Sequence, residues 1–132
     1  MKTQLIQRKE RRIAQIPADQ LNQLIIDAIQ DKKGIDLIKL DLRSLEEAPA
    51  DFFIICNGNS ETQVKAIADN IQYELKQKVN ELPSHVEGIQ NATWVLIDYF
   101  DVVVHVFHQK ARKFYQLEKL WNDAVITEYQ NL

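Results

Sequence analysis

The sequence has one cysteine in 132 residues, no long apolar run and no excess of positive charge. A single cysteine, Cys56, excludes a framework of internal disulfides and is typical of a protein in a reducing cytosol. The apolar runs are too short to cross a bilayer, and residues 1–17 contain no continuous apolar stretch of the kind that a signal peptide needs. We therefore expect a cytoplasmic chain without a membrane segment.

The net charge of −3 disfavours free nucleic acid as a specific partner, because binding to phosphates requires a surplus of lysine and arginine. The charge is uneven, since the first residues hold the cations Lys2, Arg8, Lys9, Arg11 and Arg12 against the single carboxylate of Glu10. We interpret residues 1–16 as a solvated basic extension; a transit peptide is disfavoured because the segment is poor in serine. The rest of the chain is then acidic and favours a basic partner surface.

The usual spacings of metal and catalytic sites are also missing. Neither H-E-x-x-H nor C-x-x-C occurs, and His105 and His108 would point to opposite faces of one strand. Cys56 lies between apolar neighbours in a predicted strand, which is typical of a small buried hydrophobe and not of a reactive thiol. We expect no metal, no cofactor and no catalytic residue.

Apolar periodicity predicts a single α/β domain, with a mixed sheet of about five strands flanked by helices. Helices are expected at residues 18–33, from Ser60 to Val79 and from Lys110 onward, the last with Phe114, Leu117 and Trp121 on one side. Strands are expected at residues 36–42, 51–57, 84–88, 93–99 and 101–107. We place the domain at residues 17–124 and leave residues 125–132 as a C-terminal tail without assigned structure.

The segment "DFFIICN", residues 51–57, is apolar on both faces, which favours a central strand covered on both sides. "GNSETQ" follows, and its S-x-x-Q spacing predicts a capping box formed by Ser60 and Gln63. A helix N-terminus also attracts anions, so a nucleotide-using enzyme with Gly58 and Ser60 at its phosphate site is an alternative. That alternative lacks a Walker A lysine and the paired carboxylates of two-metal chemistry.

The predicted hairpin in "DYFDVVVHVF", residues 98–107, combines an aliphatic run with polar residues. A loop of two or four residues would pair Asp98 with Asp101, Leu96 with Val103 and Trp94 with His105. Directly opposed carboxylates destabilise a hairpin unless a cationic group neutralises them. This arrangement therefore favours a patch that binds a basic protein. The residue pattern leaves a second interpretation open, in which Trp94 lies under a helix and the aspartates are solvated turn residues.

Longer blocks of the sequence carry a family resemblance. They are "ADFFIICNGNSETQVKAIADNI", the pair "EG" at residues 87–88, "WVLIDYFDVVVHVF" and "FYQLEKLWNDA", in this order and with matching spacing. Together they resemble the ribosomal silencing factor family, RsfS, also called Iojap, from about residue 21 to Ala124.

The resemblance implies a nucleotidyltransferase-like fold without the catalytic carboxylates, and a role as a translation repressor. Family members bind the large ribosomal subunit through its protein fourteen and obstruct joining of the small subunit when nutrients are scarce. Relatives in organelles are linked to assembly of the large subunit, which is the alternative role. The resemblance leaves a homodimer open.

Carried over by position, the resemblance implies that the partner-binding residues are Trp94, Asp98, Asp101, Val103, His105, Tyr115, Leu117, Glu118 and Trp121. The family usually has glycine where this chain has Phe100, and glycine takes positive φ at no steric cost. Phenylalanine does not, so we expect a different turn, with Tyr99 and Phe100 as an exposed aromatic tip that adds to the partner-binding set.

Overall fold

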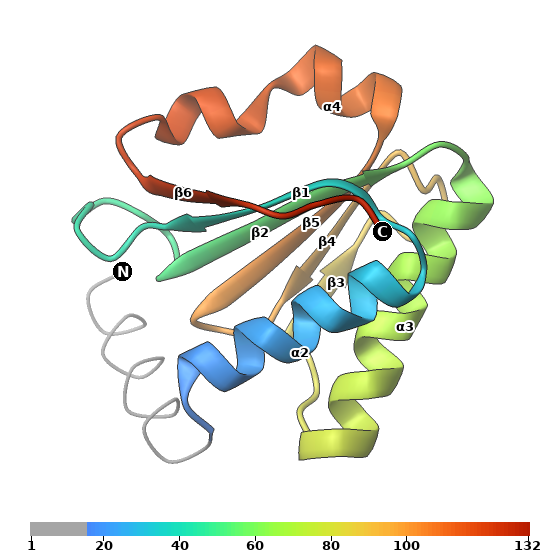
Figure 1. The fold of residues 1–132 in the computed structure, drawn as a ribbon, viewed down its shortest axis with the longest axis horizontal. Coiled ribbons are helices and arrows are strands. Elements are labelled where there is room, and N and C mark those ends of the chain that lie inside the picture. Colours follow the sequence, from blue (N-terminus) through green and yellow to red (C-terminus); the bar gives the residue numbers. More distant parts are fainter. Residues whose placement is uncertain (1–15) are drawn as a thin grey trace.

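A computed structural model describes residues 16–132 as one mixed sheet with helices on both faces (Figure 1). The helical elements are α2 (Ala18–Asp31), α3 (Glu61–Val79), α4 (Gln109–Tyr115) and the 3₁₀ helix η1 (Leu117–Trp121). The strands are β1 (Ile35–Asp41), β2 (Phe52–Gly58), β3 (His85–Glu87), β4 (Trp94–Asp98), β5 (Val102–His108) and β6 (Val125–Glu128). The predicted α/β class is confirmed, with six strands in place of about five.

The sheet has the strand order β3-β4-β5-β2-β1-β6, and only the central pair of β2 and β5 is parallel. Every residue of β2 is buried, as the apolar run at residues 52–56 predicted. None of the helices within residues 16–132 has the length and apolar character needed to cross a membrane.

The two faces of the sheet have separate cores. The larger core lies under α2 and α3, and it buries the predicted stripe of α3, namely Val64, Ile67, Ala68, Ile71 and Leu75. The smaller core lies under α4 and η1, whose Ala111, Leu117 and Trp121 pack on the opposite face of the sheet. The small core includes Trp94, Val103, Leu117 and Trp121, four of the residues that the family resemblance singled out.

The start of α3 has the predicted cap, with one difference in the reciprocal bond. The Ser60 hydroxyl accepts a hydrogen bond from the Gln63 backbone N–H at 3.1 Å, but the Gln63 side chain accepts from the Asn59 N–H, at 2.7 Å, and not from the cap residue itself. The Gln63 amide also donates to the carbonyls of Lys32 and Lys33 at the end of α2. The segment "GNSETQ" therefore joins the ends of two helices.

Two expectations for the C-terminal region are wrong. Residues 125–132, left without assigned structure, contain β6, which pairs antiparallel with β1. The single helix expected from Lys110 is broken at Gln116, which has a positive φ of 48° and ends α4 before η1 begins. Because of this break Phe114 does not share a side with Leu117 and Trp121; it is 80% exposed.

The turn between β4 and β5 also differs from expectation. Phe100 adopts the left-handed conformation, with φ of 71°, although it is not glycine. Its backbone N–H donates to the Asp98 carboxylate at 2.8 Å, which stabilises this conformation. Tyr99 is fully buried in the large core under α2 and α3, so the predicted exposed aromatic tip does not form.

The strain at Phe100 leads to a stability prediction. A left-handed conformation costs a residue with a Cβ atom roughly 1 kcal/mol relative to glycine. We expect Phe100→Gly to be more stable than Phe100→Ala by about 1 kcal/mol in urea unfolding, since both variants remove the ring and only the first relieves the backbone. Equal stability of the two variants would show that the turn does not hold residue 100 at positive φ.

Candidate partner-binding face

The hairpin presents the predicted residues to the α4 side of the sheet, but in a different register. The observed pairs are Trp94 with Phe107, Leu96 with His105 and Asp98 with Val103. The register is shifted by two residues from the predicted one, so each side chain keeps its predicted face. Trp94 and His105 are now diagonal neighbours, and the indole N–H donates to His105 Nδ1 at 3.0 Å.

Aromatic side chains from the sheet and from the α4–η1 segment meet around this hydrogen bond. Ring centroids lie 4.8 Å apart for Trp94 and Phe107, and 4.9 Å apart for Trp94 and Tyr115. Phe53 lies 4.7 Å from His105 and 5.9 Å from Trp121. We call Phe53, Trp94, His105, Phe107, Tyr115 and Trp121 the aromatic cluster; it fastens α4 and η1 onto the sheet.

The predicted site residues differ strongly in exposure. Tyr99, Asp101, Val103 and His105 are buried, and only Tyr115, at 52%, is exposed. The half-buried remainder consists of Trp94, Asp98, Phe100, Leu117, Glu118 and Trp121. The structure thus brings most of these residues together on one face, with Tyr99 on the opposite face of the sheet, and uses the buried ones as support.

The predicted pairing of Asp98 with Asp101 is wrong, and so is the alternative in which both aspartates are solvated turn residues. Asp98 lies opposite Val103, and its carboxylate accepts the Phe100 N–H. Asp101 is 4% exposed, and its backbone carbonyl accepts the N–H groups of Asp51 and Phe52. Both aspartates therefore shape the turn and join it to the start of β2.

His105 is neutral in this environment. Its Nδ1 accepts the Trp94 N–H, so the ring proton resides on Nε2, which is buried without a partner in the described chain. Burial lowers the pKa of His105 to about 4, because the low-dielectric surroundings disfavour the imidazolium. The histidine acts as a hydrogen-bond acceptor inside the small core.

Three large apolar side chains on the α4–η1 segment point to solvent instead. Phe114 is 80% exposed, Tyr115 52% and Leu120 74%, and the rings of Phe114 and Tyr115 lie 5.1 Å apart. We call these three residues the apolar patch. Sequence reasoning missed Phe114 and Leu120 as site residues because a continuous helix would have turned Phe114 toward the core. The left-handed conformation of Gln116 ends the helix and leaves Phe114 facing solvent. Glutamine gives no sequence signal for this conformation, whereas glycine would.

The features that could support catalysis have structural roles. Cys56 is fully buried, and burial raises the pKa of its thiol to about 12, which is unsuited to a nucleophile. At the supposed phosphate site, the amides of Asn59, Gln63 and Val64 already donate within the cap. Within residues 16–132, no three His, Cys, Asp or Glu side chains converge as metal ligands.

Comparison with known proteins assigns this arrangement to a family. Residues 15–132 match the family model RsfS, described as "Ribosomal silencing factor during starvation". The ribosomal silencing factor RsfS of Halalkalibacterium halodurans is 44% identical over 113 residues, which are 86% of this chain and 95% of that protein. The mitochondrial Iojap-related protein of Arabidopsis thaliana is 41% identical over 78 residues, or 55% of this chain and 41% of that protein.

Solved structures agree with the sequence relatives. A crystal structure of a Chromobacterium violaceum protein superposes with a TM-score of 0.77 at 36% identity, and the alignment covers 81% of this chain and 88% of that one. The fold, the matched length and the relatives lead to one assignment. The chain belongs to the ribosomal silencing factor family, RsfS.

Proposed function

We propose that the protein binds the large ribosomal subunit through its protein fourteen and thereby prevents the small subunit from joining. In this way it represses translation when nutrients are limiting. The observation that carries the proposal is the apolar patch, in which Phe114, Tyr115 and Leu120 stand exposed on the segment that the aromatic cluster fastens to the sheet. Exposed aromatic and apolar side chains on a rigid support are typical of a protein-binding surface.

The buried residues of the face contribute indirectly. Trp94, which is half-buried, contacts Tyr115 and donates its indole N–H to the buried His105, so these two residues help to set the position of the patch. A preorganised anchor loses less conformational entropy on binding than a mobile one, which raises affinity. The half-buried Asp98, Glu118 and Trp121 lie at positions that the family resemblance assigns to the interface.

The mechanism that follows is steric and requires no bond to be made or broken. A domain bound to the inter-subunit surface occupies space that the small subunit needs, and the acidic balance of this chain suits a basic ribosomal protein. The absence of catalytic groups among the residues discussed above is compatible with this mechanism, because excluded volume alone produces the block.

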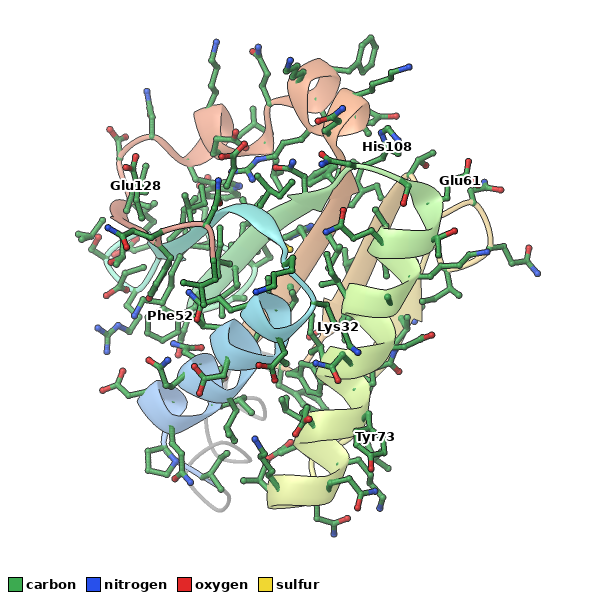
Figure 2. All side chains as sticks on the ribbon, turned by 45° about the vertical axis from the view of Figure 1, so that its right-hand side comes forward. Lys32, Phe52, Glu61, Tyr73, His108 and Glu128 are labelled. Atoms are coloured by element: carbon green, nitrogen blue, oxygen red, sulfur yellow. The ribbon has the colours of Figure 1, made fainter. Side chains whose placement is uncertain are left out.

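The test compares two pairs of exposed apolar residues. We expect Phe114→Glu combined with Leu120→Glu to weaken binding to purified large subunits by about thirtyfold or more, as for interface anchors worth roughly 2 kcal/mol. The matched control is Tyr73→Glu with Leu82→Glu, because these side chains are 62% and 60% exposed and Tyr73 projects from α3, on the other face of the sheet (Figure 2). The control pair should bind within about threefold of the natural sequence.

Sucrose-gradient sedimentation provides the measurement. The natural protein should migrate with large subunits and reduce the peak of joined ribosomes, whereas the patch variant should do neither. Binding confined to immature large subunits would favour the assembly role instead. Co-migration with small subunits alone, or equal loss of binding in the control pair, would contradict the proposal. Trp94 is avoided here because its removal would also disturb His105 and Tyr115.

A further inference from the structure

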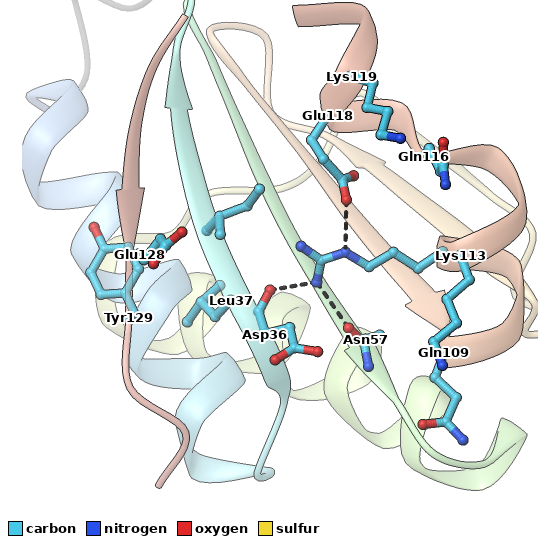
Figure 3. A pocket seen from close by; sticks show the side chains of 12 residues that line it. Asp36, Leu37, Asn57, Gln109, Lys113, Gln116, Glu118, Lys119, Glu128 and Tyr129 are labelled. Carbon is cyan, nitrogen blue, oxygen red and sulfur yellow. Dashed lines mark hydrogen bonds and ion pairs between the residues drawn. The ribbon is translucent and has the colours of Figure 1, made fainter. Parts of the chain in front are cut away.

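A pocket of about 630 Å³ lies beside the partner-binding face, between the α4–η1 segment and the edge of the sheet formed by β1 and β6. Its volume is within the range of small-molecule sites. Arg112 of α4 lines this pocket, and its contacts with Asp36, Asn57 and Glu118 are the dashed lines of Figure 3. The side chain of Arg112 is only 11% exposed.

Three acceptors hold the guanidinium in place. Nη1 donates to the backbone carbonyl of Asp36 and, at 2.9 Å, to the amide oxygen of Asn57, which is itself 4% exposed. Nε lies 3.5 Å from the Glu118 carboxylate. These bonds connect α4 to the beginning of β1, the end of β2 and η1, so they account for a structural role of Arg112 in full.

The remaining nitrogen, Nη2, has no such role. No residue in the described part of the chain accepts a hydrogen bond from it, and Arg112 lines the pocket. A guanidinium has five N–H donors in a planar fork, and the two on Nη2 are suited to the oxygens of a carboxylate or phosphate. Lys113 and Lys119 line the same side of the pocket.

The opposite side limits what can enter. Asp36 and Glu128 contribute carboxylates there, beside the apolar and aromatic surfaces of Leu37 and Tyr129. Glu118 adds a third carboxylate next to Arg112, and its Oε2 is buried without a hydrogen-bond partner in the described chain. A ligand with several negative charges would meet these carboxylates as well as Arg112, which disfavours it. A small molecule with one oxyanion group, and a body that is neutral or cationic, would satisfy both sides.

We propose that this pocket binds a small molecule through a single carboxylate or phosphate group held by Arg112 Nη2. The inference concerns the isolated protein and does not depend on the ribosomal role. Neither the family match nor the relatives' names assign a ligand to these residues.

The experiment titrates the full-length protein with acetate and, separately, with inorganic phosphate at constant ionic strength, monitored by ¹H–¹⁵N NMR. We expect saturable shifts at the backbone amides of Asp36, Arg112 and Lys119, with a dissociation constant on the order of 1–10 mM for a small probe. Saturation by acetate alone identifies a carboxylate site, and saturation by phosphate alone a phosphate site; either result supports the proposal.

Variants separate this site from general ion binding. Arg112→Lys keeps the charge but loses the fork, and it should weaken the probe at least about tenfold. Lys110→Gln removes an exposed lysine of the same helix that does not line the pocket, and it should bind normally. If Arg112→Lys lowers the melting temperature strongly, the exposed pair Lys113→Gln and Lys119→Gln replaces it, with an expected loss of about threefold or more. The proposal would be overturned if neither probe saturates. It would also be overturned if binding is unchanged in Arg112→Lys or, where that variant is destabilised, in the Lys113→Gln and Lys119→Gln pair.

Discussion

Replacing Gly88 by alanine is expected to lower the free energy of unfolding by about 4 kcal/mol or more, the largest effect we predict for a single methyl group. Gly88 has a positive φ of 87°, between β3 and the turn that leads to β4. A Cβ atom at this position would lie 2.0 Å from the carbonyl oxygen of Trp94 and 3.1 Å from its carbonyl carbon. Because both are backbone atoms, no side-chain rotation can relieve the overlap.

The damage would extend to the partner-binding face. Backbone strain at residue 88 accounts for roughly 1–2 kcal/mol, and the rest comes from displacing the beginning of β4. Trp94 is the first residue of β4, so its indole would lose its alignment with His105 and Tyr115. The variant should therefore lose near-ultraviolet circular dichroism from the aromatic cluster as well as stability in urea.

Gly58→Ala is the matched control for this prediction. A Cβ atom at residue 58 would lie 3.2 Å from a methyl group of Val64 and 3.2 Å from the Val64 backbone nitrogen. The φ angle of Gly58 is not in the left-handed region. We expect a cost of about 1–2 kcal/mol, small enough for the protein to remain folded. Similar unfolding midpoints for the two variants would mean that Gly88 does not approach Trp94 as closely as described.

The sequence predicted the faces of the hairpin correctly and its register incorrectly, for one physical reason. Alternation of side chains has a period of two, so a shift by two residues leaves every residue on its face and changes only its partner. The pairing is decided by the turn, where Phe100 takes the positive φ that we expected only of glycine. Tyr99 was misplaced although it continues the alternation of Val95 and Ile97, both of which are buried in the large core.

Exposure could not be derived from the hairpin alone. Whether His105 is open or covered depends on where α4 and η1 lie, and their path depends on the αL residue Gln116. Strand β6 was missed because all four of its residues are exposed at an edge of the sheet, so it has no apolar periodicity. By contrast, β2 and α3 were predicted because their burial is set by patterns within each segment.

Acid is expected to destabilise the fold by about 3 kcal/mol through His105 alone, between pH 6.5 and pH 4. Burial lowers the pKa of His105 from 6.5 to about 4, so the unfolded chain takes up a proton in this interval and the folded chain does not. The contribution of the neutral histidine to stability is therefore complete above pH 6.5 and is lost as the pH falls toward 4. His105 is only 3% exposed, so solvent screens this effect little.

Protonation also conflicts directly with the hydrogen bond that organises the face. Nδ1 accepts the Trp94 N–H, and an imidazolium would direct a second N–H at the same donor. Opening the aromatic cluster to hydrate the charged ring would release Trp94 from its contact with Tyr115 and unseat part of the apolar patch. Acid should thus reduce partner binding before global unfolding is complete.

Carboxylates titrate in the same pH range, so the test compares variants and not absolute values. Urea unfolding is measured at intervals from pH 7 to pH 4 for the natural protein, for His105→Gln and for His85→Gln. Glutamine at residue 105 offers Trp94 an oxygen acceptor that does not titrate in this range. The free energy of unfolding of the His105→Gln variant should therefore fall by about 3 kcal/mol less between pH 7 and pH 4 than that of the natural protein. The side chain of His85 is 57% exposed, so solvent screens its pair with Glu87, and its replacement should change the loss of stability by less than about 1 kcal/mol. A contrary result would be a His105→Gln profile parallel to that of the natural protein together with a flatter profile for His85→Gln. The acid sensitivity would then not originate in the small core, and the assignment of His105 as neutral and bonded to Trp94 would be wrong.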